Sequence, residues 1–203
     1  MISKETKLYG LVLAGGKSQR MGHDKSIIEW HGKEQRYYVA DLLQEFCDEV
    51  YISCRAEQQN EIDNHYQTLV DKIEVKGPAA GILTALFEKE NTAWLVVACD
   101  LPLLYKDTLQ YLIDNRDQTK VATTFKSPHD GLPEPLITIW EPKAKEALLS
   151  FVETGHSCPR KALINSDTYI IEPQYPEALI NANTPEDAER VRDILTAKMN
   201  TTR

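Results

Sequence analysis

Short apolar runs alternate with amphipathic stretches along most of this 203-residue chain. Apolar runs of this length indicate strands, and the stretches between them place apolar residues at helical spacing. Strands that alternate with helices predict an α/β fold of three layers, α/β/α, with a mostly parallel, Rossmann-like sheet covered on both faces. The predicted strands are residues 8–13, 49–53, 68–70, 93–98, 121–124 and 136–140, and the predicted helices are residues 35–46, 80–90, 106–115, 141–153 and 184–199.

The bulk composition narrows the class of protein further. A chain that is 42% hydrophobic and 27% charged has the composition of a soluble globular protein, and at this length we expect one domain over residues 1–203. No apolar run approaches the roughly 20 residues of a membrane span, and the N-terminus has no signal-type apolar core, so we expect a cytoplasmic protein. The net charge of −8 argues against a nucleic-acid surface. Any anionic ligand must therefore meet a local basic pocket.

The four cysteines are widely spaced and form no CxxC pair. This pattern predicts buried thiols in a reducing compartment rather than a zinc site. A Pro-containing segment, residues 127–135, is predicted to be a connecting loop that could form a wall of the site.

A glycine pair follows the first predicted strand. Leu13 ends the apolar run, and Ala14, Gly15 and Gly16 come directly after it. Two glycines permit a tight backbone path whose N–H groups can point at phosphate oxygens without interference from Cβ atoms. The spacing fits neither GxxxxGK[ST] nor GxGxxG, which excludes the two best-known phosphate loops.

Three cations follow the glycines within nine positions: Lys17, Arg20 and Lys25. Arginine can contact phosphate through two parallel hydrogen bonds, and lysine acts as a compact point charge, so the set suits a triphosphate. A glycine pair with scattered cations also fits an ordinary turn followed by a solvated basic loop. The residue types alone leave both interpretations open.

The stretch LAGGKSQRMGHDK, residues 13–25, resembles the LAGGxSxRMGxDK signature of the molybdenum cofactor guanylyltransferases at every defined position. These enzymes lie in the wider nucleotidyltransferase superfamily, so the resemblance implies a fold of the nucleotide-diphospho-sugar transferase type. It also implies a GTP-binding site that includes Leu13, Ala14, Gly15 and Gly16. Arg20 and Lys25 are implied to be catalytic, through neutralisation of phosphate charge, with Lys25 also binding the nucleotide.

Two aspartates follow predicted strands. Asp100 comes directly after an apolar strand, at the sheet edge where α/β proteins build their sites. A carboxylate there suits Mg²⁺. VVACDLPLL resembles the family's metal-binding strand end, which implies that Asp100 is catalytic and holds Mg²⁺, with Mn²⁺ as an alternative. Asp71 precedes KGPAAGI, similar to the family's Asp and GPxxG turn, which implies nucleotide contact. Either aspartate alone could instead be a cap or turn residue.

Further contacts are implied by weaker elements. NANTPED resembles the family's NxNTPED element, which places Asn183 near the metal and the acceptor. Thr184 and Pro185 have the pattern of a helix start. Ser53 is expected to contact the nucleotide. Some family members have Asn near this position, so this chain departs from the family at the pocket for the base rather than at the phosphate site.

The acceptor is expected to bind in the C-terminal half and the nucleotide in the N-terminal half. Arg160 and Lys161 could bind the phosphate of a pterin, or could be a solvated helix face, and His156 has no metal-ligand spacing. Glu134 lies beside the predicted acceptor segment, where its charge would repel an anionic acceptor unless it points away.

The resemblance implies transfer of GMP from GTP to the terminal phosphate of molybdenum-molybdopterin, with release of pyrophosphate. Contact with molybdoenzyme maturation proteins is implied as well, and the oligomeric state stays open. The alternatives are a related cytidylyltransferase, a nucleotidyltransferase for a sugar or lactate phosphate, and a nucleotide-binding accessory protein without catalysis.

Overall fold

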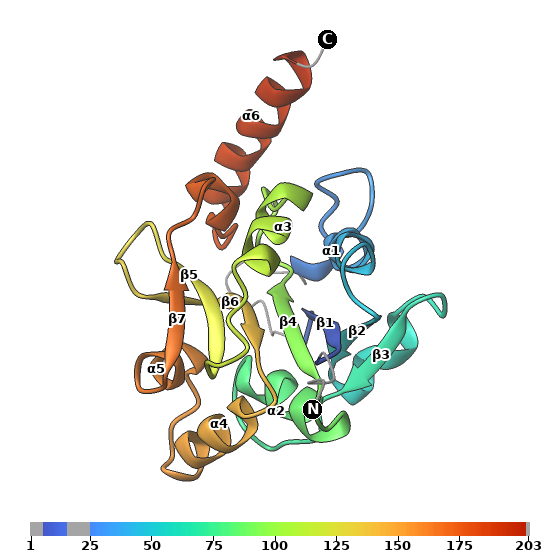
Figure 1. Cartoon of the computed structure of the whole chain (residues 1–203). Helices are drawn as coiled ribbons and strands as arrows, with labels where there is room; N and C mark the ends of the chain where they lie inside the picture. The colour runs from blue at the N-terminus through green and yellow to red at the C-terminus, as the bar shows by residue number, and fades with distance from the viewer. Residues whose placement is uncertain (1–5, 16–24, 202–203) are drawn as a thin grey trace.

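A computed structural model describes residues 6–15 and 25–201 of the chain, which begins at the blue end of Figure 1 and finishes in the red helix α6. The strands are β1 (Leu8–Leu13), β2 (Glu49–Cys54), β3 (Gln67–Val70), β4 (Ala93–Ala98), β5 (Ala122–Lys126), β6 (Pro133–Trp140) and β7 (Thr168–Ile171). The α-helices are α1 (Gln35–Gln44), α2 (Ala79–Glu88), α3 (Lys106–Asp114), α4 (Ala144–Glu153), α5 (Pro159–Ile164) and α6 (Pro185–Thr201). Short 3₁₀ helices are η1 (Lys25–Ile27), η2 (Ala56–Glu61) and η3 (Pro176–Leu179).

Within the described ranges, seven strands form one sheet in the order β3-β2-β1-β4-β6-β5-β7. β1 pairs in parallel with both β2 and β4, β2 pairs in parallel with β3, and β5 pairs in parallel with β7. β6 is antiparallel to its neighbours β4 and β5. The carboxyl ends of β1 to β5 and β7 therefore meet at one edge of the sheet, together with the first residues of β6. We call this the carboxyl edge.

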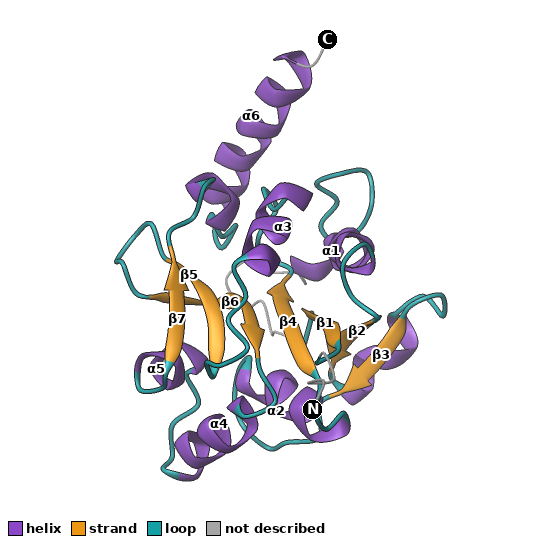
Figure 2. Ribbon diagram, viewed as in Figure 1, coloured by secondary structure: helices purple, strands orange, loops and turns teal. Residues whose placement is uncertain are grey.

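Helices cover both faces of the sheet, as Figure 2 shows. One face packs Val39 and Leu43 of α1 and Leu109 of α3 against strand residues such as Val12, all fully buried. The opposite face packs α2, α4 and α5 against the alternate residues of the same strands, among them Leu11. Side chains alternate between the faces of a strand, so a sheet buried on both sides needs continuous apolar runs. β4 is buried along its whole length for this reason.

The start of α6 packs on the body through a third, smaller cluster, which includes Leu103, Ala182 and Val191. Beyond this contact the helix extends away from the sheet (Figure 1). None of the helices in the described part of the chain is long and apolar enough to cross a membrane.

The three-layer architecture and all six predicted strands are confirmed, as are the five predicted helices. The loop predicted over residues 127–135 is wrong at its end, because β6 already begins at Pro133 and pairs there with Lys126. β7 and α5 are additional elements. The four cysteines were predicted to be buried. Cys54 and Cys99 are buried, whereas Cys47 is partly exposed and Cys158 is exposed. All four are free thiols.

Candidate active site at the carboxyl edge of the sheet

The end of β1 is tied to both neighbouring strands. The backbone N–H of Ala14 donates to the carbonyl of Ser53 at 3.1 Å, and the N–H of Cys99 donates to the carbonyl of Leu13 at 3.4 Å. These bonds continue the parallel pairing of β1 beyond its last residue. They hold the start of the glycine loop between the segments that follow β2 and β4.

A hydroxyl and a carboxylate form a tight pair beside this loop. Ser53, 1% exposed, donates from Oγ to Asp71 Oδ1 at 2.7 Å. A Cβ atom on Gly81 of α2 would lie 2.4 Å from Ser53 Oγ, and one on Gly15 would lie 3.2 Å from Asp71 Oδ2. The two glycines therefore allow strand ends, loop and helix to approach one another closely.

Burial raises the pKa of Asp71, while the hydroxyl of Ser53 and the charge of Arg55 act in the opposite direction. Arg55 follows β2 directly and reaches back to the loop, where Nη1 donates to the carbonyl of Gly15 at 2.6 Å. Its Nε donates to Glu57 Oε1 at 2.7 Å. A guanidinium thus lies between the ends of β1 and β3, beside a partly buried carboxylate.

Asp100 follows β4 and lies next to the segment that begins α6. Its carbonyl accepts a hydrogen bond of 2.9 Å from the backbone N–H of Ala182. The residues on either side of Ala182 are Asn181 and Asn183, so two amide side chains flank the bond to Asp100. Asn181 Oδ1 is buried and accepts no hydrogen bond from the described residues. A buried acceptor of this kind suits a cation or a donor from a substrate.

The helix start beside Asn183 is built by reciprocal capping. Asp187 donates its backbone N–H to Thr184 Oγ1 at 3.1 Å, and Asp187 Oδ2 accepts from the backbone N–H groups of Thr184 and Asn183 at 2.9 and 3.0 Å. Pro185 is the first residue of α6, as predicted. The cap fixes the backbone of Asn183 at the carboxyl edge.

Glu134 lies on the other side of Asp100. The antiparallel pairing of β4 with β6 ends at Val97 and Ile137, and Asp100 and Glu134 each lie three residues beyond this pair. Glu134 is 3% exposed. Burial raises its pKa, while the charge of Arg160 works against this rise and the charge of Asp100 adds to it.

Arg160 neutralises part of this negative charge. Its Nη2 donates to Glu134 Oε2 at 3.0 Å and its Nη1 to Asp130 Oδ2 at 2.8 Å. The expected repulsion of an anionic acceptor by Glu134 is thereby reduced.

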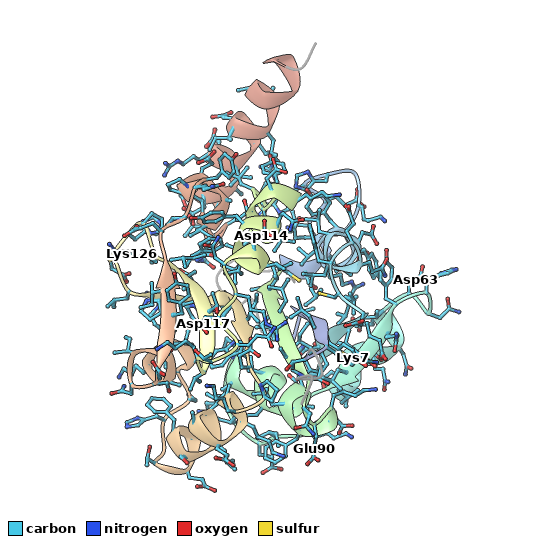
Figure 3. The ribbon with its side chains drawn as sticks, in the orientation of Figure 1. Lys7, Asp63, Glu90, Asp114, Asp117 and Lys126 are labelled. Carbon is cyan, nitrogen blue, oxygen red and sulfur yellow. The ribbon has the colours of Figure 1, made fainter. Side chains whose placement is uncertain are left out.

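Lys126, labelled in Figure 3, lies at the end of β5 and pairs with Glu172 at 2.6 Å. Lys161 and His156 are exposed.

The structure therefore brings most of the described predicted residues to one edge, in two groups. Leu13, Ala14, Gly15, Ser53 and Asp71 form one group. Asp100 follows the next strand, β4, and Asn183 lies beside it, one residue after Ala182, which donates to the carbonyl of Asp100. Gly16 and Arg20 lie outside the described residues, and so does the side chain of Lys25. No group of three or more His, Cys, Asp or Glu side chains with metal-binding geometry occurs in the described part of the chain. Of the predicted oxygen donors, Asp100 and Asn183 come from segments that the bond to Ala182 joins.

Sequence reasoning missed Arg55. The signal was present, because Arg55 follows its strand just as Asp71 and Asp100 follow theirs, and polar residues at the carboxyl ends of parallel strands converge. The burial of Glu134 was also unexpected, since a glutamate between two prolines in a predicted loop gives no sign of the arginine that pairs with it.

Comparison with known proteins identifies the family of the chain. Residues 10–169 match the family model described as a MobA-like NTP transferase domain. A probable molybdenum cofactor guanylyltransferase of Natronomonas pharaonis is 32% identical over 200 residues, which cover 92% of this chain and 97% of that protein.

The chain belongs to the molybdenum cofactor guanylyltransferase family. It is accordingly a transferase enzyme of the nucleotidyltransferase class. A molybdenum cofactor biosynthesis bifunctional protein of Synechocystis is 39% identical over 184 residues, which are 90% of this chain. The match covers 53% of that protein, so this chain spans about half the length of that relative.

A solved structure has the same fold. The structure of molybdopterin-guanine dinucleotide biosynthesis protein A from Archaeoglobus fulgidus superposes with a TM-score of 0.78, covering 93% of this chain and 99% of that chain at 23% identity. The fold class is thus α/β of the nucleotide-diphospho-sugar transferase type, as the family resemblance implied.

Proposed function

We propose that this chain transfers GMP from GTP to the terminal phosphate of molybdenum-carrying molybdopterin and releases pyrophosphate. The product is the guanine dinucleotide form of the cofactor. The observation that carries the proposal is the position of Asp100, which follows the central strand β4 with the Ser53–Asp71 group on one side and Glu134 with Arg160 on the other. This arrangement suits a reaction between a nucleotide and a second, separately bound substrate.

The chemistry requires positioning and charge neutralisation rather than a general base. The attacking oxygen belongs to a phosphate and is already anionic, so it can attack the α-phosphorus in line as pyrophosphate leaves. Backbone N–H groups at Gly15 and Gly16 are assigned to the phosphates. Arg20 and Lys25 are assigned to neutralise the charge that develops on them.

A divalent cation, Mg²⁺ or Mn²⁺, would offset charge on the triphosphate and on the leaving group. Asp100 and Asn183 fit as its protein ligands, because a carboxylate and an amide oxygen are hard donors that suit such ions. The buried oxygen of Asn181 supports a polar occupant at the same place. Few protein ligands are needed, since Mg²⁺ completes its coordination with phosphate oxygens and water.

We further propose one domain with a division of roles, in which the N-terminal half binds the nucleotide and the C-terminal half binds the acceptor. The cytoplasm is the proposed location, which the four free thiols support. Contact with molybdoenzyme maturation proteins is part of the same proposal.

The proposal can be tested by calorimetric titration of GTP, CTP, ATP and UTP in the presence of Mg²⁺, followed by a pyrophosphate-release assay with the molybdopterin acceptor. We expect preference for GTP and acceptor-dependent release of pyrophosphate. Asp100→Asn should lower turnover by at least about a hundredfold, since charge stabilisation of this kind contributes factors of that size. Asp167→Asn is the matched control, because this exposed carboxylate precedes the edge strand β7 and pairs only with Lys120 among the described residues.

Three outcomes would contradict the proposal. Preference for CTP would identify a cytidylyltransferase. Release of pyrophosphate with a sugar or lactate phosphate, but not with molybdopterin, would change the acceptor. Tight binding of GTP without any turnover would identify a nucleotide-binding accessory protein.

A further inference from the structure

The strand order separates a nucleoside side of the site from its acceptor side. β2 and β3 lie beyond β1 when viewed from β4, and β6 lies on the opposite side of β4. Neighbouring strands are about 4.8 Å apart, so the ends of β2 and β3 lie roughly 10–15 Å from the end of β4. If the α-phosphate reacts beside Asp100, the base of the same nucleotide extends toward the segments that follow β2 and β3.

Arg55 is held rigidly at that place. Its backbone N–H donates to Gln58 Oε1 at 3.1 Å, and its carbonyl accepts from the N–H of Gln58 at 3.0 Å. Its side chain is fixed by the carbonyl of Gly15 and by Glu57, and 28% of it is exposed. A guanidinium has five N–H donors, and these two bonds use one donor on Nη1 and the one on Nε. Among the described contacts, neither N–H group of Nη2 donates a hydrogen bond, so both can donate to another acceptor.

Asp71 and Arg55 both lie against Gly15, because a Cβ there would be 3.2 Å from Asp71 Oδ2 and Arg55 Nη1 donates to its carbonyl at 2.6 Å. Ser53 is less accessible to a base than Arg55, because the residue is 1% exposed and its hydroxyl donates to Asp71. The nucleoside side thus presents a cationic donor and an anionic acceptor next to each other. The two come from the segments that follow adjacent strands, β2 and β3.

This pair of opposite charges matches the edges of guanine. Guanine presents the acceptors O6 and N7 on one edge, and in protein–DNA complexes a bidentate contact from arginine or lysine to this edge is the most common specific contact. Its N1–H and 2-amino groups are donors, which a carboxylate accepts. Adenine and cytosine carry an exocyclic amino donor where guanine has O6, so they would place a donor against the guanidinium.

We propose that Arg55 is a specificity-determining residue that binds the O6 and N7 edge of guanine in GTP. The proposal rests on the proposed function, because it takes the α-phosphate of GTP to react beside Asp100. It also supplies a base contact where the family resemblance led to Ser53.

The test uses base analogues and calorimetric titration with Mg²⁺. We expect wild-type protein to bind GTP and inosine triphosphate, which both carry O6 and N7, at least about tenfold more tightly than 7-deaza-GTP, which lacks N7. In Arg55→Met the affinity for GTP should fall by at least about tenfold, and the preference for GTP over 7-deaza-GTP should disappear. Arg55→Lys should keep part of the affinity but lose most of the discrimination, because lysine lacks the fork.

Arg190→Met, an exposed arginine on α6, is the matched control and should leave all affinities unchanged. Thermal unfolding of each variant checks that the fold is retained. If Arg55→Met weakens GTP and 7-deaza-GTP by the same factor, Arg55 acts only through the carbonyl of Gly15 and the specificity role is overturned.

Failure of this proposal can be distinguished from failure of the proposed function. If wild-type protein prefers CTP or binds no nucleotide, both fall. If wild-type protein prefers GTP and turns it over, but the discrimination against 7-deaza-GTP persists in Arg55→Met, only the role of Arg55 is refuted.

Discussion

Among single residues, Gly81 has an environment that no other amino acid would fit without rearrangement. It lies on α2, and its missing Cβ leaves space for Ser53 Oγ, which in turn holds Asp71. A glycine inside a helix costs about 1 kcal/mol relative to alanine, so this position gives up helix stability for a close approach of α2 to the strand ends.

Gly81→Ala should therefore lower the free energy of unfolding by ~1–2 kcal/mol, because overpacking outweighs the gain in helix propensity. Urea unfolding measures this. Ser53→Ala removes the clashing oxygen, so the double variant should be more stable than the sum of the two single changes predicts. Strictly additive losses would show that Ser53 is not the cause.

His31 is expected to make the stability of the fold depend on pH. Its ring stacks on Tyr38 with centroids 3.8 Å apart and Nε2 lies 2.8 Å from the carbonyl oxygen of Pro102. Burial lowers the pKa of His31 below its usual value of 6.5, and the bond to Pro102 only partly opposes this. Between the two values the unfolded chain binds more protons, so this residue's contribution to stability is present above the unfolded pKa and is lost as the pH falls.

We expect wild-type protein to lose more unfolding free energy than His31→Phe between about pH 7 and pH 5, because phenylalanine can keep the stack on Tyr38 but does not titrate. Denaturant unfolding at several pH values measures the difference. A constant difference across this range would contradict the assignment.

At the level of elements, the sequence predicts the strands and helices that apolar periodicity and run length encode. It does not predict a strand or a side-chain contact that forms only against a partner segment. β4 is a run of six buried residues, and its bounds are as predicted. β7 has four residues at the edge of the sheet, and its exposed Tyr169 and Ile170 give no buried pattern, so it is a strand because β5 pairs with it. In the same way, Arg160 acquires its environment only when α5 faces the start of β6.

The N-terminal cap of α6 is expected to stabilise the fold beside Asn183. Thr184→Ala should cost about 1 kcal/mol of unfolding free energy, because it removes the acceptor for the N–H of Asp187. Thr196→Ala in the same helix is the control and should change stability by less than about 0.5 kcal/mol, since this exposed hydroxyl only donates to the carbonyl of Arg192. Equal effects at the two positions would refute the capping role.

Across the whole molecule, one buried ion pair joins segments far apart in sequence. Arg116, after α3, contacts Glu141, after β6, through two bonds of 2.7 and 2.9 Å, with the side chains 9% and 2% exposed. Arg116 also reaches the carbonyl of Thr6 at 3.5 Å. The pair closes the end of the sheet opposite to the carboxyl edge.

Glu141→Leu should lower the unfolding free energy by about 3–5 kcal/mol, because it leaves a buried guanidinium without its carboxylate. Arg116→Met combined with Glu141→Leu should recover much of this loss, since no buried charge then stays uncompensated. Equilibrium unfolding of the three proteins measures the effect. A double variant no more stable than Glu141→Leu would contradict the explanation.

The reversed direction of β6 has a consequence for how such enzymes can diversify. The residues proposed to bind the nucleotide follow the carboxyl ends of strands, whereas Glu134 lies near the start of a strand, after the turn at residues 127–132. Lengthening that turn would reshape the surroundings of Glu134 while the pairing of β4 with β1 stayed in register. On the proposed function, a change confined to this hairpin therefore alters the acceptor side of the site and leaves the nucleotide side unchanged.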